Sequence, residues 1–335
     1  MTSQSVIFGC AGLSLSEDER RFYYDVQPWG FILFARNIDT ADQVKALCAE
    51  LRSTVGRDAP ILIDQEGGRV ARLRAPLAEE WPNPKDHILG LPLDRACDVM
   101  RLRYKMIADD ILRLGIDVNC APMLDVSQDD TNAIIADRAY GSDANTVSKI
   151  GRAAMDGLLS GGVLPVIKHI PGHGRATIDS HLDLPRVMVD LEDLRKVDFA
   201  PFAALRDAPM AMTAHVIYDA VDPERCATLS PSVIQLIREE LEVDALLMTD
   251  DLSMKALQGR FQDRAANALE AGCDIILHCN GVIEEMTEVA KGLKPLANRA
   301  LYRANAALAA KMPTKDLDRE EARARLRYLL NTRNA

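Results

Sequence analysis

The chain has 335 residues, of which 48% are hydrophobic and 27% charged, a composition typical of folded globular proteins and one that argues against intrinsic disorder. Its formal net charge of -10 disfavours electrostatic binding to nucleic acid or to an anionic membrane surface. The sign of the charge places no limit on small-molecule substrates.

The seven cysteines are scattered along the chain, and no two of them form a Cys-x-x-Cys pair. We therefore expect reduced, mostly buried thiols rather than a disulfide framework. Residues 1–12 lack the basic and apolar regions of a signal peptide, and no later stretch reaches the roughly 18 apolar residues of a membrane span. These features predict a cytoplasmic protein that does not bind membranes.

Eight short apolar runs rich in Val, Ile and Leu recur along the chain, and a longer segment with helical periodicity follows each of them. This alternation is typical of parallel strands joined by crossover helices. In chain order, the runs cover residues 6–8, 31–34, 61–63, 118–120, 164–167, 210–212, 245–248 and 275–277. Eight parallel strands are the number that a closed (β/α)8 barrel needs.

Two helix starts can be read from the local sequence. Thr40, with Gln43 three residues later, fits a capping box, and Ser230 places a capping hydroxyl before Pro231. No Pro/Gly/Ser-rich linker or change of composition divides the chain, which favours one barrel over two domains. We therefore predict an α/β fold in which residues 1–335 form a single TIM-barrel catalytic domain with a C-terminal helical tail at 317–331.

Polar side chains gather directly after five of the predicted strands. In a (β/α)8 barrel the chemistry lies on the loops that leave the C-terminal ends of the strands. In chain order, these side chains are Asp64, Glu66, Arg69, Arg72, Asp125, Asp137, Arg138, Lys168, His169, His173, His215, Asp250 and Asp251. Any one of them could be an ordinary solvated loop residue, but the whole set predicts an active site around one barrel mouth.

The loop at residues 172–181 combines glycines with a pair of polar side chains. Asp179 and His181 are two residues apart, close enough for the carboxylate to accept a hydrogen bond from the imidazole. Such a bond fixes the tautomer and stabilises the imidazolium, which gives a group that exchanges protons near neutral pH. The alternative is a histidine that only anchors the loop by hydrogen bonding.

Asp250 and Asp251 follow the seventh apolar run side by side. Adjacent side chains on an extended backbone point to opposite sides, so we expect only one of the two carboxylates at the barrel mouth. Asp250 comes first after the apolar run and is the better candidate for a reacting carboxylate. Asp251 is expected to accept structural hydrogen bonds from backbone or arginine groups.

Three sequence blocks, in this order along the chain, resemble the motifs of the β-N-acetylglucosaminidases of glycoside hydrolase family 3. They are DQEGGRV at residues 64–70, KHIPGHG at 168–174 with DSH at 179–181, and MTDDLSM at 248–254. The resemblance extends roughly from residue 30 to residue 278 and is of the single-barrel type found in Gram-negative bacteria. Ile170 stands where phenylalanine is common in the motif, an apolar exchange.

The resemblance implies a retaining hydrolase that removes terminal N-acetylglucosamine in two displacements, without a metal or an organic cofactor. Asp250 would attack the anomeric carbon, and His181, oriented by Asp179, would act as general acid and base. The side chains implied to hold the sugar are Asp64, Arg72, Arg138, Lys168 and His169. The implied substrate is N-acetylglucosamine β-1,4-linked to 1,6-anhydro-N-acetylmuramic acid, with or without its peptide, a muropeptide of peptidoglycan recycling.

Three other interpretations are open at this point. A metal-dependent hydrolase on the same fold would take ligands from His169, His173, Asp179, His181 and His215, although the Lys168 ammonium would stand beside the ion. A phosphate-binding aldolase or isomerase would use the glycine of the segment 272–276 for phosphate and Lys168 for a Schiff base. A non-catalytic sugar-binding barrel would need neither a nucleophile nor a proton-transfer group.

Overall fold

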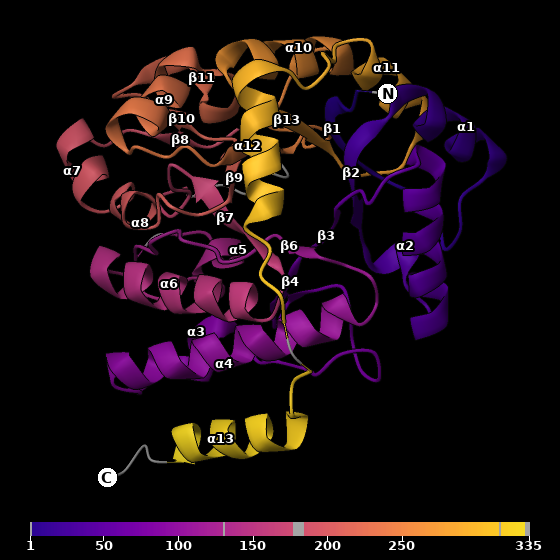
Figure 1. Cartoon of the computed structure of the whole chain (residues 1–335). Helices are drawn as coiled ribbons and strands as arrows, with labels where there is room; N and C mark the ends of the chain where they lie inside the picture. The colour runs from indigo at the N-terminus through magenta and orange to yellow at the C-terminus, as the bar shows by residue number, and fades with distance from the viewer. Residues whose placement is uncertain (1, 130, 177–183, 315, 332–335) are drawn as a thin grey trace.

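The computed structural model describes residues 2–129, 131–176, 184–314 and 316–331. Eight parallel strands close into a barrel in the spatial order β1-β13-β12-β9-β7-β6-β3-β2, which confirms the predicted (β/α)8 fold (Figure 1). The strands are β1 (Gln4–Gly9), β2 (Pro28–Leu33), β3 (Ile61–Ile63), β6 (Val118–Asn119), β7 (Leu164–Ile170), β9 (Met210–Thr213), β12 (Leu246–Asp251) and β13 (Ile275–His278). Each predicted apolar run overlaps one of these strands.

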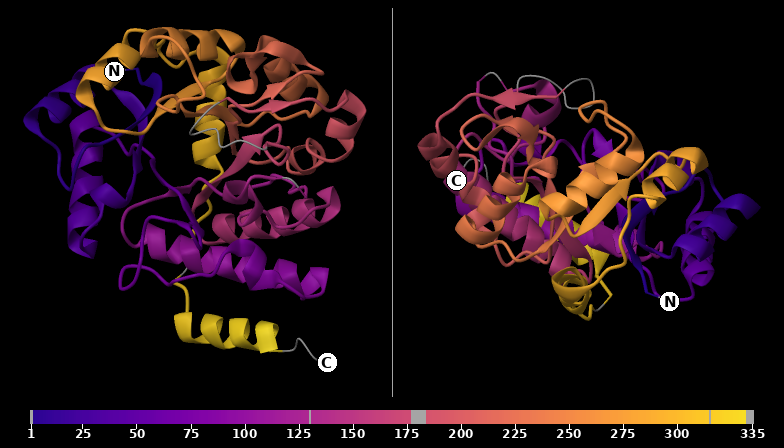
Figure 2. Two further views of the ribbon diagram at one scale, coloured as in Figure 1. Left: turned by 180° about the vertical axis from the view of Figure 1, so that it is seen from behind. Right: turned by 90° about the horizontal axis from the view of Figure 1, so that it is seen from above.

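Helices lie around the outside of the barrel in all three views (Figures 1 and 2). The helices are α1 (Glu17–Val26), α2 (Ala41–Val55), α3 (Pro84–Ile88), α4 (Leu93–Leu112), α5 (Ala133–Ala136), α6 (Ala144–Ser160), α7 (Leu191–Lys196), α8 (Ala200–Ala204), α9 (Pro231–Gln235), α10 (Phe261–Ala271), α11 (Ile283–Ala290), α12 (Asn298–Ala309) and α13 (Arg319–Asn331). Short 3-10 or π segments occupy η1 (Ala35–Asn37), η2 (Ala227–Leu229) and η3 (Leu236–Glu240).

Two small sheets, which the apolar runs did not predict, stand apart from the barrel sheet. One is the pair β4 (Gln65–Gly67) and β5 (Val70–Ala71), and the other joins β8 (Arg186–Val187), β10 (Ile217–Tyr218) and β11 (Asp222–Cys226). The β4–β5 pair follows β3 directly and therefore lies at the C-terminal end of the barrel, where the chemistry of this fold is found.

Both predicted helix starts are helix N-caps in the structure. The Thr40 side chain accepts a hydrogen bond from the backbone of Gln43 at 3.3 Å, and Ser230 accepts one from Val233 at 3.2 Å. The reciprocal half of the capping box differs, because the Gln43 side chain accepts from the Asp39 amide rather than from Thr40. These caps satisfy amide groups that the first helical turn leaves free.

The interior of the barrel is filled by apolar side chains from all eight strands. The cluster includes Ile7, Leu62, Val166 and Met248, and Ala304 of α12 packs against the same cluster. A second, larger core lies between the strands and the surrounding helices. The filled interior leaves the C-terminal ends of the strands as the place for a substrate cavity.

Helix α13 forms the predicted C-terminal tail and lies along α4, at the bottom of Figure 1. Its Leu326 and Leu329 side chains are buried in the outer core. Arg319 adds an ion pair to Asp110, with Nη1 2.7 Å from Oδ1. The tail is therefore fixed to the barrel by both apolar and ionic contacts.

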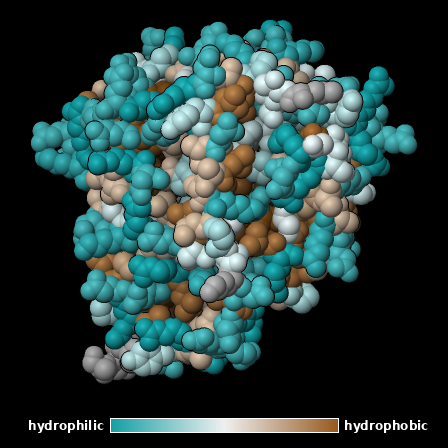
Figure 3. All heavy atoms as spheres, in the orientation of Figure 1, coloured by the Kyte–Doolittle hydropathy of each residue, from teal (hydrophilic) through white to brown (hydrophobic). Residues whose placement is uncertain are grey.

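The surface in Figure 3 is mostly hydrophilic, with apolar side chains visible mainly in a band down the middle of this face. No helix in the described part of the chain is both long and apolar enough to cross a membrane. All seven cysteines are free thiols, as predicted, and six of them are buried.

Candidate active site

A cavity of about 400 Å³ opens at the C-terminal ends of the barrel strands. This volume lies within the range of small-molecule binding sites. The charged and imidazole side chains that line it are Asp64, Arg69, Arg72, Arg138, Lys168, His169, Asp250 and Asp251. Six of the predicted site residues are therefore brought together. The predicted proton-transfer pair, Asp179 and His181, lies outside the described residues.

Asp64, directly after β3, bridges two of the cations predicted to hold the sugar. Its Oδ1 accepts a hydrogen bond from Lys168 Nζ at 2.8 Å, and its Oδ2 accepts one from Arg72 Nη2 at 3.0 Å. Burial raises the pKa of Asp64, but Lys168 and Arg72 outweigh burial and hold the pKa well below its usual range. Asp64 is therefore a carboxylate at neutral pH and fixes both cations.

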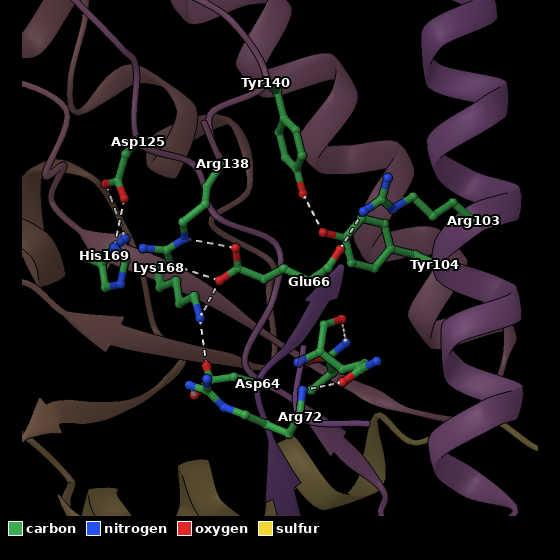
Figure 4. A network of polar contacts seen from close by, with 12 residues as sticks. Asp64, Glu66, Arg72, Arg103, Tyr104, Asp125, Arg138, Tyr140, Lys168 and His169 are labelled. Carbon is green, nitrogen blue, oxygen red and sulfur yellow. Dashed lines mark hydrogen bonds and ion pairs between the residues drawn. The ribbon is translucent and has the colours of Figure 1, made fainter. Parts of the chain in front are cut away.

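Glu66 is a buried member of the site whose role the sequence analysis missed. Its Oε1 lies 2.8 Å from both Lys168 Nζ and Arg138 Nη2, and its Oε2 accepts from Arg138 Nε at 2.9 Å (Figure 4). Burial raises the pKa of Glu66, but Arg138 and Lys168 together lower it to about 2. Strand periodicity could have revealed it, because residues two apart in an extended segment, here 64 and 66, share a face.

Lys168, near the end of β7, is held as an ammonium. Burial lowers its pKa, but the carboxylates of Asp64 and Glu66 raise it above the ordinary value. A Schiff-base lysine needs a neutral amine, so this environment opposes the aldolase interpretation. Gly272, the proposed phosphate-binding residue, instead ends helix α10 with φ +113° and faces Ile234.

Asp125 and His169 form an aspartate–histidine pair that the sequence analysis did not single out. Asp125 is fully buried, and its Oδ2 lies 2.7 Å from His169 Nδ1, while its Oδ1 accepts from the amide of His173 at 2.6 Å. Burial raises the pKa of Asp125, but the two imidazoles lower it to about 2. The carboxylate orients His169 and leaves the opposite ring nitrogen for a ligand in the cavity.

Asp250 lies one residue before the end of β12 and lines the cavity. Its Oδ1 accepts from the Asp251 amide at 2.8 Å, and its Oδ2 has no hydrogen-bond partner among the described residues. Burial raises the pKa of Asp250, but His169, His215, the Asp251 amide and Lys168 lower it below the ordinary value. Asp250 is therefore ionised at neutral pH, with one oxygen available to a ligand.

Asp251 accepts structural hydrogen bonds, as expected. Its carboxylate accepts from the backbone and hydroxyl of Ser253, at 3.0 and 2.5 Å, and from the Cys279 amide at 3.1 Å. The expectation that only one of the two aspartates would face the mouth was wrong, because Asp251 also borders the cavity. A register shift between Met248 and Asp251 against β13 interrupts the regular alternation of the strand.

The histidines proposed as metal ligands are engaged with protein groups where the structure describes them. Within residues 2–129, 131–176, 184–314 and 316–331, no group of three or more His, Cys, Asp or Glu side chains could hold a metal ion. His215 is fully buried, with Nδ1 2.7 Å from the Thr228 hydroxyl and Nε2 3.1 Å from the Asp251 carbonyl. His169 uses Nδ1 for Asp125.

Comparisons with known proteins identify the family of this chain. Residues 11–307 match the family described as "Glycosyl hydrolase family 3 N terminal domain". Proteins named beta-hexosaminidase from Thiobacillus denitrificans and Methylococcus capsulatus are 35% and 37% identical, over 84% and 82% of this chain and 79% and 82% of theirs.

Two solved structures are also similar. One is a glycoside hydrolase family 3 beta-N-acetylglucosaminidase from Paenibacillus sp. str. FPU-7, with TM-score 0.86 and 30% identity, covering 97% of this chain and 67% of that one. The other is NagZ from Neisseria gonorrhoeae in complex with N-trifluoroacetyl-D-glucosamine, with TM-score 0.84 and 28% identity, covering 99% and 98%.

Proposed function

The chain belongs to glycosyl hydrolase family 3, and from this membership we propose that it is a retaining exo-β-N-acetylglucosaminidase. Relatives named beta-hexosaminidase support the class of enzyme, and the similar structure with bound N-trifluoroacetyl-D-glucosamine supports recognition of an N-acylated glucosamine. The proposed substrate is N-acetylglucosamine β-1,4-linked to 1,6-anhydro-N-acetylmuramic acid, with or without its peptide. The observation that carries the proposal is the ionised Asp250 carboxylate, with a free oxygen, at a cavity lined by hydrogen-bonding groups.

In the first displacement, Asp250 attacks the anomeric carbon of the terminal sugar. The new bond joins a carboxylate oxygen to C1, while the bond from C1 to the bridging oxygen breaks and its electron pair goes to that oxygen. His181, oriented by Asp179, donates a proton to the departing oxygen. The products of this step are a glycosyl ester on Asp250 and the released saccharide.

In the second displacement, water attacks C1 of the glycosyl ester. His181, now neutral, takes a proton from the water, and the bond from C1 to Asp250 breaks to regenerate the carboxylate. Two inversions at C1 leave N-acetylglucosamine with its β configuration. Neither step requires a metal or an organic cofactor.

The state of the carboxylates near the cavity supports the assignment of proton transfer to an imidazole. A general acid must carry a proton at the working pH. Asp64 and Glu66 are held ionised by their cations, and the Asp251 carboxylate accepts three hydrogen bonds. Among the described residues, none of these three carboxylates is suited to protonate a leaving group, which favours His181 in that role.

The other predicted side chains would hold the hydroxyl and acetamido groups of the sugar. Asp64, Arg72, Arg138, Lys168 and His169 all line the cavity. Contacts with the carboxylates of Asp64, Glu66 and Asp125 fix the orientation of the other four side chains before a ligand enters. We propose that residues 1–335 act as one catalytic domain with a helical tail. The enzyme is proposed to work in the cytoplasm on saccharides recovered from the cell wall.

Two measurements test the proposal. Incubation with a panel of muropeptides and chitooligosaccharides, followed by mass spectrometry, should detect released N-acetylglucosamine. A slow fluorinated N-acetylglucosaminide should leave a sugar adduct on Asp250, and the Asp250→Asn variant, treated in the same way, should remain unlabelled. Absence of sugar release would refute the glycosidase, and an adduct on another residue would refute the nucleophile.

A further inference from the structure

The cations at the cavity differ in whether the protein already neutralises them. Arg72 is paired with Asp64, Arg138 with Glu66, and Lys168 with both carboxylates. Arg69 also lines the cavity, but its guanidinium has no partner among the described residues. The inner cations are suited to a neutral sugar, whereas Arg69 is available to an anion.

Arg69 lies at the mouth of the cavity and not in its interior. Its side chain is exposed, whereas Arg138 and Lys168 are buried. Apolar side chains fill the barrel from below, so any part of a substrate beyond the terminal sugar must extend through the mouth. Arg69 is therefore placed on the side where the departing part of the substrate lies.

The backbone that carries Arg69 is fixed in place. Arg69 stands in the turn between β4 and β5, where its amide donates to Asn83 Oδ1 at 3.3 Å and the Gly68 amide donates to the Trp81 carbonyl at 2.9 Å. Gly68 has φ +62°, and a Cβ atom there would lie 2.1 Å from Asn83 Oδ1. A rigid turn thus presents a side chain that the protein leaves unpaired.

Apolar side chains line the same cavity as Arg69. They include Val70, the next residue in the chain, together with Ile134 and Met254. This combination of one cation with aliphatic surface suits a group that has a carbon skeleton and a carboxylate.

We propose that Arg69 is a specificity-determining residue that binds a carboxylate on the leaving-group side of the substrate. The proposal rests on the glycosidase activity proposed above and names the residue that would distinguish an acidic departing part from a neutral one. A free cation at the mouth favours such substrates over neutral ones of the same size. The inner cations would bind the terminal sugar, which is the same in acidic and neutral substrates, so they do not distinguish the two.

The test compares two substrates that differ only in charge. They are N-acetylglucosaminyl-β-1,4-N-acetylmuramic acid and its methylamide, in which the carboxylate is replaced by a neutral group of similar size. We expect kcat/KM of the native enzyme to favour the acid by about fivefold at low salt, the upper range for an exposed charge pair. The preference should shrink as ionic strength rises.

Three variants separate a contact from a general charge effect. Arg69→Gln should abolish the preference, and Arg69→Lys should retain part of it. Arg74→Gln removes the same charge from an exposed arginine of the same segment that does not line the cavity, and it should leave the preference unchanged. Equal loss in Arg69→Gln and Arg74→Gln, or no preference in the native enzyme, would overturn the proposal.

A neutral aryl β-N-acetylglucosaminide distinguishes failure of this proposal from failure of the function itself. If the native enzyme and the control variant Arg74→Gln cleave the aryl glycoside equally well, the glycosidase stands and only the acid preference is under test. If the native enzyme cleaves neither the aryl glycoside nor the disaccharides, the proposed function fails and the subsite fails with it.

Discussion

Lys168 Nζ lies 2.8 Å from Glu66 Oε1, an oxygen that also accepts a hydrogen bond from Arg138. Glu66 does not itself line the cavity, so it acts on the proposed sugar site through the two cations that do. The contact joins residues 102 positions apart in the chain and brings β4 and the end of β7 into one charge network (Figure 4).

Glu66→Gln is expected to destabilise the fold by about 3 kcal/mol at pH 7, because it leaves the buried Arg138 without its counter-charge, whereas Lys168 keeps Asp64. The pKa of Glu66 is about 2 in the folded state, below its ordinary value of 4.5. The contribution of the ionised Glu66 to the stability of the fold is therefore present above about pH 4.5 and is lost as the pH falls toward 2. Urea unfolding at several pH values should show the native and Gln proteins converging below pH 4.5. A constant difference at all pH values would contradict this account.

Asp250→Asn should lower kcat for an aryl β-N-acetylglucosaminide by roughly 10⁴-fold or more, since no nucleophile remains. The asparagine oxygen can still accept the hydrogen bond from the Asp251 amide, so the fold should be retained. Steady-state kinetics, with circular dichroism as the check on folding, measure both effects. Turnover near the native rate would remove Asp250 from the mechanism.

His181→Ala should reduce kcat by about 10²–10⁴-fold for substrates with poor leaving groups and much less for glycosides of acidic phenols, which depart without protonation. The matched variant is His169→Ala, because His169 also belongs to an aspartate–histidine pair and lines the cavity. If His169 only binds the sugar, its loss should affect both kinds of leaving group alike. The opposite pattern would move the acid role from His181 to His169.

Asp198→Asn should change how stability depends on pH. Burial raises the pKa of Asp198 to about 6 even though Arg175 Nε lies 2.7 Å from its Oδ2. A carboxyl with a raised folded pKa favours the native state at low pH, and this contribution is lost as pH rises from about 3.8 through 6. Between pH 3.8 and 6, the free energy of unfolding of Asp198→Asn should therefore rise by roughly 3 kcal/mol relative to that of the native protein. Urea unfolding measures this difference. If the free energies of unfolding of the two proteins changed with pH in parallel, the raised pKa of Asp198 would be refuted.

The barrel could be predicted because strands buried on both faces leave a local mark, namely apolar runs such as 61–63 and 275–277. Asp64 and Asp250 could be placed at the site for the same reason, since each follows such a run directly. Position after a strand is enough to bring a side chain to the barrel mouth, even when nothing is known about its partners.

The partners themselves could not be predicted, because they depend on which side chains meet across the barrel. The Asp125–His169 pair spans 44 residues, and the Glu66–Arg138 pair spans 72. The position of Asp251 at the cavity depends on an irregularity in strand pairing that has no local sequence signal. The small sheet joins β8, from the segment between β7 and α7, to β10 and β11, from the segment between β9 and α9, and neither segment has strong apolar alternation.

Asp64, Glu66, Arg72, Arg138 and Lys168 form ion pairs with one another and need no ligand to complete them. The free-energy cost of removing these charges from water therefore arises when the chain folds. It is not repeated when a saccharide enters. A sugar has only to displace water from groups that already stand in their final positions, so little side-chain entropy is lost on association. For the proposed terminal sugar, the cavity is thus a preorganised polar environment, and its rigidity comes from the same ion pairs that join the strand ends of the barrel.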